Sequence, residues 1–157
     1  MPFNCVIVGQ GQQLIACAEV LLGSGNQIQN LVSDCPQVAS WSQKKGISRL
    51  SLKEGLNDPY EGDPFDYLFS IVNHSILPPS LLALPRLGAI NYHDSALPKY
   101  SGFNATTWSI LGGEVEHGVT WHRMTTEVDA GAILIQKKFP ISDDDTAFSL
   151  AARAATF

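Results

Sequence analysis

The chain has 157 residues, of which 45% are apolar and 16% are charged, with 13 glycines and 9 prolines. This is the length and the ordinary composition of one globular domain, which excludes a disordered chain, a collagen and a coiled coil. The formal net charge is -5 and the basic residues are scattered, so no basic stripe is present and a nucleic-acid partner is not expected. No apolar run approaches the roughly 18 residues of a membrane span, and the N-terminus lacks the basic residues of a signal peptide.

The three cysteines, Cys5, Cys17 and Cys35, are an odd number with wide spacing. They form neither a CxxC pair nor a compact Cys/His cluster, so the sequence predicts neither a zinc site nor a disulfide framework. We expect all three to be small buried hydrophobic residues in a reducing, cytoplasmic protein.

The first half of the chain alternates between β-rich runs and segments with helical spacing of apolar residues. Strands are expected at residues 3–8 and 28–32, and helices at residues 12–22 and 36–45. Asp34 is expected to cap the second helix and Pro36 to occupy its first turn. Residues 51–64 carry turn residues and little periodicity, which indicates a surface connection or an irregular crossover.

The second half continues this alternation and ends in an acidic run. Strands are expected at residues 67–72, 89–93, 119–124 and 132–139, and helices at residues 78–84 and 104–111. Asp143 to Asp145 are expected to open a final helix, because carboxylates are favourable at a helix N-terminus. The alternation predicts a mostly parallel α/β sheet in one domain over residues 1–157, in a chain that is expected to be the start of a larger protein.

A glycine-rich turn at Gly9 and Gly11 invites comparison with a dinucleotide site. The third glycine of GxGxxG would stand at position 14, which is Leu14, and no acidic residue ends the second strand. The two glycines therefore indicate a tight turn from strand to helix.

Asn91 and His93 are better candidates for chemistry. On a strand they share one face, near the carboxyl edge where parallel sheets form sites. A neutral imidazole accepts a proton there, while an amide donates to a negative oxygen. Asp129 follows in a loop of small residues, from which its carboxylate would orient His93 and favour its charge. The alternatives are a satisfied polar strand end for the pair and an Asx turn for Asp129.

These residues belong to motifs that stand in a fixed order. The motifs are Asn91-x-His93-x-Ser95-x-Leu97-Pro98-x-Tyr100-x-Gly102, then His117-Gly118-Val119-Thr120-x-His122, then Asp129-x-Gly131-x-Ile133. Together they resemble the core of the formyltetrahydrofolate-dependent formyltransferases. That group includes methionyl-tRNA, glycinamide-ribonucleotide and amino-sugar formyltransferases and the formylation domains of some nonribosomal peptide synthetases. The resemblance implies a Rossmann-like α/β fold, a mostly parallel sheet with helices on both faces, truncated at its C-terminal side.

The resemblance also implies a reaction, the transfer of a formyl group from 10-formyltetrahydrofolate to a primary amine without a metal. It places Asn91, His93 and Asp129 at the catalytic positions, with Asn91 donating to the oxyanion, His93 stabilising it or relaying the proton, and Asp129 orienting His93. The residues implied to bind the folate are Ser70, His74, Ser75, Ile76, Leu77, Glu127 and Val128. The residues implied to line the acceptor cleft are Gln10, Gly11, Ser95, Lys99, Tyr100 and Gly102.

Two positions depart from the family pattern and bear on the acceptor. Ala96 replaces a leucine, and Ser101 replaces an arginine that would meet an anionic acceptor. The acidic net charge argues against tRNA as the acceptor. The loss of the arginine, together with residues 102–108 around the implied cleft, favours an aminoacyl group on the carrier domain of a nonribosomal peptide synthetase, with adenylation and carrier domains as partners. The alternatives are an amino-sugar or methionyl-tRNA formyltransferase, a formyltetrahydrofolate hydrolase and a non-catalytic folate-binding fragment.

Overall fold

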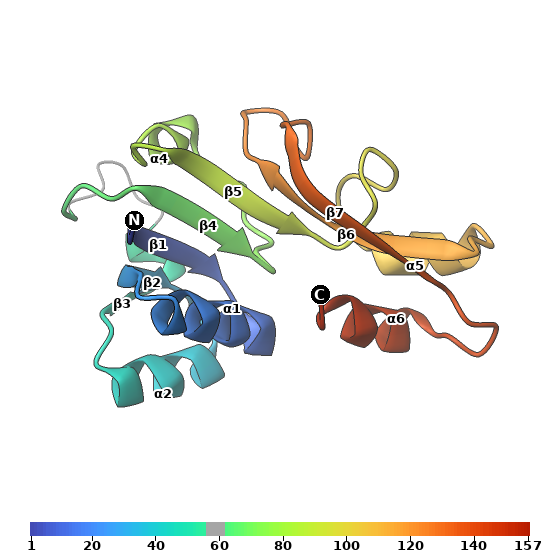
Figure 1. Ribbon diagram of the computed structural model, residues 1–157, viewed down its shortest axis with the longest axis horizontal. Helices are drawn as coiled ribbons and strands as arrows, with labels where there is room; N and C mark the ends of the chain where they lie inside the picture. The colour runs from blue at the N-terminus through green and yellow to red at the C-terminus, as the bar shows by residue number, and fades with distance from the viewer. Residues whose placement is uncertain (56–61) are drawn as a thin grey trace. The chain divides into compact units, whose positions relative to one another are not determined.

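The computed structural model describes residues 1–55 and 62–157, whose strands form a seven-stranded sheet in the order β3-β2-β1-β4-β5-β6-β7 (Figure 1). The strands are β1 (Asn4–Gly9), β2 (Gln27–Val32), β3 (Arg49–Leu50), β4 (Tyr67–Ile71), β5 (Gly88–His93), β6 (Glu116–Arg123) and β7 (Ile133–Pro140). The helices are α1 (Gly11–Gly23), α2 (Pro36–Lys45), α3 (Leu52–Gly55), α4 (Pro79–Leu82), α5 (Ala105–Leu111) and α6 (Ala147–Ala154). The chain divides into two compact units, Met1–Asn91 and Tyr92–Phe157.

The first unit is built by parallel pairing around β1. This strand pairs with β2 on one side and β4 on the other, and β2 also pairs in parallel with β3. Residues 5–9 are all buried, the pattern of a strand that is covered on both faces. At Gly9 the backbone φ is +146°, and a Cβ would lie 1.7 Å from the carbonyl oxygen of Ile71. A glycine is therefore required where the carboxyl ends of β1 and β4 meet.

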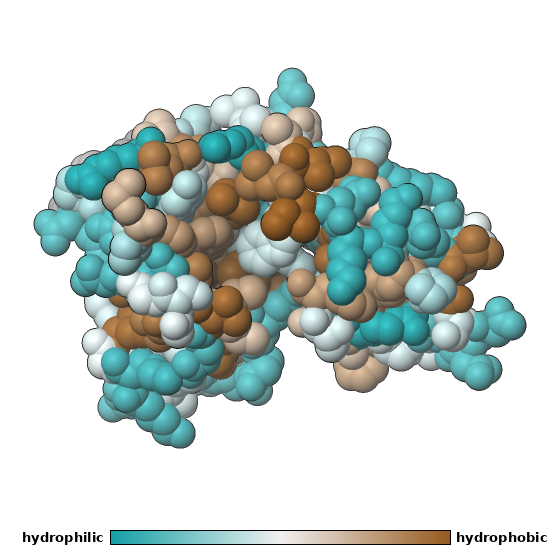
Figure 2. Space-filling model, in the orientation of Figure 1, coloured by the Kyte–Doolittle hydropathy of each residue, from teal (hydrophilic) through white to brown (hydrophobic). Residues whose placement is uncertain are grey.

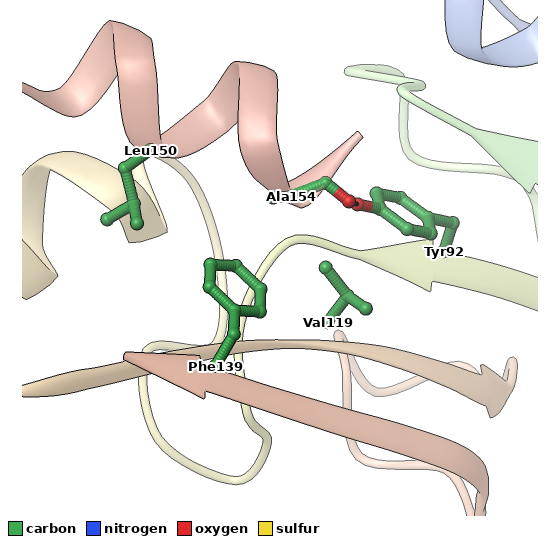
Figure 3. Packing of buried hydrophobic residues seen from close by; sticks show 5 residues of the cluster. All are labelled: Tyr92, Val119, Phe139, Leu150 and Ala154. Carbon is green, nitrogen blue, oxygen red and sulfur yellow. Dashed lines mark hydrogen bonds between the residues drawn. The ribbon is translucent and has the colours of Figure 1, made fainter. Parts of the chain in front are cut away.

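The second unit has its own apolar core between a β-hairpin and the last helix. β6 and β7 pair antiparallel, and Figure 3 shows the cluster of Tyr92, Val119, Phe139, Leu150 and Ala154 packed between these strands and α6. The Tyr92 hydroxyl donates to the carbonyl oxygen of Ala154 at 3.0 Å. This hydrogen bond satisfies a buried phenol and ties the end of α6 to β5.

β7 is the last strand in the sheet order and exposes apolar side chains at its start. Ile133, Leu134 and Ile135 are 48%, 44% and 66% exposed, and Figure 2 shows a hydrophobic patch over this part of the hairpin. Lys137 and Lys138 follow, and lysines on an edge strand oppose pairing with another chain. The second half of the edge is therefore protected by charge, whereas the first half is not.

The predicted alternation of strands and helices is confirmed, but the predicted cap of α2 is wrong. The residue at the N-cap of α2 is Cys35, and Asp34 Oδ1 instead accepts a hydrogen bond from the Leu52 N–H at 3.2 Å. The Asp34 carboxylate therefore accepts from a main-chain N–H after β3 and not from an N–H at the start of α2. The segment after β3 forms the short helix α3, and residues 56–61 of the predicted connection lie outside the described residues.

The acidic run before the last helix also differs from its predicted role. α6 begins at Ala147, and its N-cap is Thr146, whose side chain forms a reciprocal capping box with Ser149. Asp145 accepts hydrogen bonds from the Ser142 N–H, the Ser149 hydroxyl and the Arg153 guanidinium. It therefore links the residues before α6 to two side chains on the helix.

The three cysteines are free thiols. Cys5 is buried in β1, in agreement with its predicted role as a small hydrophobic residue. Cys17 and Cys35 are partly exposed, which corrects the expectation that all three are buried. Cys35 is more accessible because it precedes a helix rather than lying within the sheet.

Candidate active site

His93 ends β5 and is held by two polar groups of the second unit. Its side chain is 7% exposed. Nε2 lies 2.8 Å from the carbonyl oxygen of Tyr100, and Nδ1 lies 3.5 Å from Asp129 Oδ2. The structure thus brings together the two residues that the sequence predicts as a catalytic histidine and its orienting carboxylate.

The loop after β5 is anchored by the buried hydroxyl of Thr120 on β6. Thr120 Oγ1 donates to the Ser95 carbonyl at 2.6 Å and accepts from the Leu97 N–H at 3.2 Å. The Gln136 side chain donates to the same hydroxyl at 3.0 Å and to the Leu97 carbonyl at 2.8 Å. These bonds attach residues 95–97 to both strands of the hairpin and so fix the start of the loop that carries Tyr100.

Asp129 takes a left-handed backbone conformation, with φ at +52°, in the connection between β6 and β7. Its Oδ2 accepts from the Gly102 N–H at 2.7 Å, and its Oδ1 lies 3.4 Å from His122 Nε2. Burial alone raises the pKa of this carboxyl, but the hydrogen bonds from His122 and Gly102 and the charge of His93 outweigh burial and lower it below its ordinary value. Asp129 is therefore a carboxylate at neutral pH.

A glycine allows this connection to fold against β6. A Cβ on Gly131 would lie 1.7 Å from the carbonyl oxygen of Arg123. The Arg123 N–H donates to the Ala132 carbonyl at 2.9 Å, which closes the connection just after Asp129. The close approach of these two backbone segments holds Asp129 over the end of β6.

His122 contacts the same carboxylate and is the functional candidate that the sequence reasoning missed. Its side chain is 3% exposed, and its Nδ1 lies 2.9 Å from the carbonyl oxygen of Arg123. The signal for it was present, because strand alternation places His122 on the same face of β6 as the anchoring Thr120. Asp129 therefore lies between two imidazole rings, whose centroids are 6.4 Å apart.

Asn91 stands two positions before His93 on β5 and is partly exposed. Strand alternation directs Asn91 and His93 to the same side of that strand, opposite to Tyr92. Its role as a donor to the oxyanion stays a prediction.

The residues predicted to bind the folate lie in separate segments of the two units. In the first, Ser70 is buried at the end of β4, Leu77 is buried, His74 is exposed, Ser75 is partly exposed, and Ile76 is 79% exposed. The Asn73 side chain bridges both main-chain groups of Ser75, which gives this segment a defined turn. In the second unit, Glu127 and Val128 are exposed directly before Asp129. A folate pocket built from these segments stays a prediction.

The residues predicted to line an acceptor cleft have different surroundings. Gln10 is exposed and its N–H donates to the Ile71 carbonyl at 3.2 Å, whereas Gly11 opens α1 with φ at +78°. Ser95 is fully buried and its hydroxyl donates to the Lys99 carbonyl at 2.7 Å, so it closes its loop rather than facing an acceptor. Gly102, partly exposed, supplies the N–H to Asp129.

Lys99 and Tyr100 meet at the carboxylate of Glu114. The Lys99 ammonium lies 2.6 Å from Glu114 Oε1, and the Tyr100 hydroxyl donates to the same oxygen at 2.7 Å. Lys99 and Glu114 border a hollow of about 460 Å³ that neither His93 nor Asp129 lines. The polar ends of these two residues thus share one carboxylate partner, and their place in an acceptor cleft stays a prediction.

Neither a metal centre nor a membrane segment is found in the part of the chain that the structure describes. Within residues 1–55 and 62–157, no three His, Cys, Asp or Glu side chains are grouped so as to hold a metal ion. No helix of these same residues has the length and hydropathy needed to cross a bilayer.

A Rossmann-like sheet with a buried histidine and carboxylate beyond β5 matches a known class of group-transfer proteins. Residues 23–157 match the model of the formyl transferase family, and the chain belongs to this family. GDP-perosamine N-formyltransferase from Brucella melitensis is 32% identical over 156 residues, which cover 92% of this chain and 60% of that protein. The chain thus spans less than two thirds of this relative's length.

Two further similarities support the same family. Methionyl-tRNA formyltransferase from Synechococcus is 43% identical over 90 residues, which cover 57% of this chain and 28% of that protein. The crystal structure of phosphoribosylglycinamide formyltransferase from Anaplasma phagocytophilum superposes with a TM-score of 0.85 and 27% identity, over 99% of this chain and 81% of that one. The fold predicted from the sequence is confirmed by this match.

Proposed function

We propose that this chain transfers a formyl group from 10-formyltetrahydrofolate to a primary amine, and that His93 and Asp129 carry the reaction. The observation that supports this function is the buried pair itself, in which the two side chains lie 3.5 Å apart and are 7% and 9% exposed. Family membership supports the donor, because a sugar 3N-formyl transferase crystallised with 5-N-formyl-THF superposes with a TM-score of 0.77 and 25% identity.

The mechanism follows from the hydrogen bonds of His93. Attack of an amine on the formyl carbon produces a tetrahedral intermediate with a negative oxygen and a positive nitrogen. One ring nitrogen of His93 faces a carbonyl and the other faces a carboxylate, and both partners only accept hydrogen bonds. His93 then stabilises the negative oxygen, while Asn91 donates its amide to the same oxygen. The intermediate collapses as the bond between the formyl carbon and N10 of the folate breaks. The proton that the amine nitrogen loses passes to N10, so the products are the formylated amine and tetrahydrofolate.

The acceptor that we propose is the amine of a nucleotide-linked amino sugar. The match to GDP-perosamine N-formyltransferase covers 92% of this chain, whereas the match to methionyl-tRNA formyltransferase covers 57%. None of the relatives named above is a synthetase, so the carrier-bound aminoacyl acceptor expected from the sequence stays a prediction. The replacement of an arginine by Ser101 makes weaker binding of the nucleotide phosphates the expected consequence.

The test is a transfer assay with 10-formyltetrahydrofolate and a panel of amines. The panel holds GDP-perosamine, glycinamide ribonucleotide, methionyl-tRNA and an aminoacyl carrier protein, and both formylated amine and free formate are measured. His93→Ala and Asp129→Asn are expected to lower kcat by a factor of about 100 to 1,000, the cost of losing an oxyanion-stabilising group. Asp144→Asn is the matched control, because Asp144 is an exposed carboxylate outside the site.

Each outcome assigns the chain to one function. Formylated GDP-perosamine as the main product supports the proposal, and formylation of the carrier-bound amino acid would replace the sugar with the acceptor predicted from the sequence. Formate without formylated amine would make the chain a hydrolase. Equal rates for Asp129→Asn and Asp144→Asn would exclude Asp129 from the reaction.

A further inference from the structure

The second histidine at Asp129 has no role in the reaction as derived so far. His122 is as buried as His93, and its Nε2 lies 3.4 Å from Asp129 Oδ1, against 3.5 Å between His93 Nδ1 and Asp129 Oδ2. Each carboxylate oxygen therefore faces one imidazole. A carboxylate that is met on both oxygens cannot rotate about its Cβ–Cγ bond without losing one partner.

The backbone fixes the direction of the His122 ring. Its Nδ1 lies 2.9 Å from the Arg123 carbonyl, which only accepts a hydrogen bond, so Nδ1 carries a proton. That bond aims Nε2 at the carboxylate, in the way that an outer partner orients a functional histidine. Because the same Arg123 carbonyl lies against Gly131, ring and carboxylate are positioned by one stretch of backbone.

We infer that His122 is a positioning residue, which holds Asp129 as a carboxylate with its Oδ2 directed at His93. This inference rests on the proposed function and deepens it. His122 Nε2 must donate to Oδ1 to do so, and the proton stays on the ring throughout the reaction. His93 remains the residue that stabilises the reacting oxygen, and His122 acts on it through Asp129.

The electrostatic surroundings agree with this assignment. Among the residues that the structure describes, the titratable groups that face Asp129 are His93 from β5 and His122 from β6, and the Gly102 N–H is the third donor. Glu127 is exposed two residues earlier in the same connection, and the Arg123 side chain is exposed at the end of β6. Loss of the donor at Oδ1 leaves a half-satisfied buried carboxylate, so the pKa of Asp129 is expected to rise toward and above its ordinary value.

The test compares three variants of the full chain. His122→Phe removes the donor, His122→Gln keeps an N–H donor without a ring, and His117→Phe is the matched control, because His117 is another buried histidine on β6 that contacts Ser109 instead. The carboxyl carbon of Asp129 is titrated by NMR in each variant, and kcat and KM are measured across pH. Thermal unfolding establishes that each variant is folded.

In His122→Phe, the Asp129 carboxyl is expected to titrate about one pH unit higher, a tenfold change in proton affinity. We expect kcat to fall about 10- to 100-fold, the usual cost of losing an orienting partner, with both KM values within about threefold. The acid limb of the plot of kcat against pH is expected to move to higher pH together with the Asp129 titration. His122→Gln is expected to restore part of the carboxyl pKa and part of kcat. An unchanged carboxyl titration in both His122 variants would overturn the inference. The titration needs no turnover, so a shifted carboxyl in a chain that does not transfer formyl groups would refute the proposed function alone.

Discussion

Replacement of Thr120 by valine tests how much the second unit depends on one buried hydroxyl. The two side chains have nearly the same shape, so the substitution removes hydrogen bonds without creating a cavity. Thr120 is 0% exposed, and its hydroxyl takes part in three hydrogen bonds. The Gln136 amide keeps its bond to the Leu97 carbonyl, but the Ser95 carbonyl and the Leu97 N–H lose their partner.

The expected cost follows from these two orphaned groups. A buried polar group left without a partner costs about 1 to 3 kcal/mol, so two of them predict a loss of about 3 kcal/mol in the free energy of unfolding. That is a large share of the roughly 5 to 15 kcal/mol that stabilises a domain. With a urea m-value of about 2 kcal/mol per M, the midpoint of unfolding should fall by about 1.5 M.

Urea titration followed by circular dichroism measures this loss. The control is Thr107→Val, because Thr107 is exposed on α5 and its replacement should change the free energy of unfolding by less than about 0.5 kcal/mol. A loss below about 1 kcal/mol in Thr120→Val, or one equal to that of the control, would show that the loop does not depend on this hydroxyl.

Two further predictions concern titratable groups other than His93 and Asp129. Burial raises the pKa of the Cys5 thiol to about 12, whereas N–H groups of Val38 and Gly11 lower the pKa of Cys35. Iodoacetamide should therefore modify Cys35 first and Cys5 only after unfolding, and peptide mapping that finds equal rates would contradict the burial argument. Burial likewise lowers the pKa of His117, and the charge of Asp94 opposes this only in part. Below pH 6.5, the ordinary pKa of histidine, the unfolded chain therefore binds a proton at His117 that the folded chain does not. The contribution of neutral His117 to the free energy of unfolding is complete above pH 6.5 and is lost as the pH falls below it. Urea titrations should show wild type losing stability relative to His117→Phe in that range, and a constant difference across pH would refute the assignment.

Local patterns predicted the strands and helices well because their causes are local. The apolar run of β1 and the helical spacing of α1 are properties of neighbouring residues, and both elements form where the sequence places them. The predicted cap of α2 failed because its carboxylate has a partner distant in sequence, the N–H of Leu52, 18 residues away. Asp145 instead finds partners close by, in Ser142 and Ser149, as well as in Arg153, so it lies just before the N-cap of α6 without being the cap itself. A capping preference is worth about 1 kcal/mol, which a competing hydrogen bond readily matches.

The site could be predicted only in part for a related reason. Motif order was enough to single out His93 and Asp129. Strand alternation alone predicts that His122 is buried, which is also true of many core residues. Its contact with Asp129 depends on the left-handed conformation at Asp129 and on the close approach of Gly131 to Arg123, which are tertiary features. The same holds for Ser95, whose polar side chain is satisfied inside its own loop.

Backbone strain and hydrogen bonding explain why stability and site geometry are linked in this unit. Tyr100 and Asp129 both have positive φ, at +58° and +52°, and a non-glycine residue in this region costs of order 1 kcal/mol or more. The strained turn at Tyr100 directs its carbonyl at His93, and the turn at Gly102 directs an N–H at Asp129. These conformations persist because the start of the loop is held by Thr120. Thr120→Val should therefore lower kcat even under conditions where the chain remains folded, since a loosened loop no longer presents either main-chain group to the buried pair.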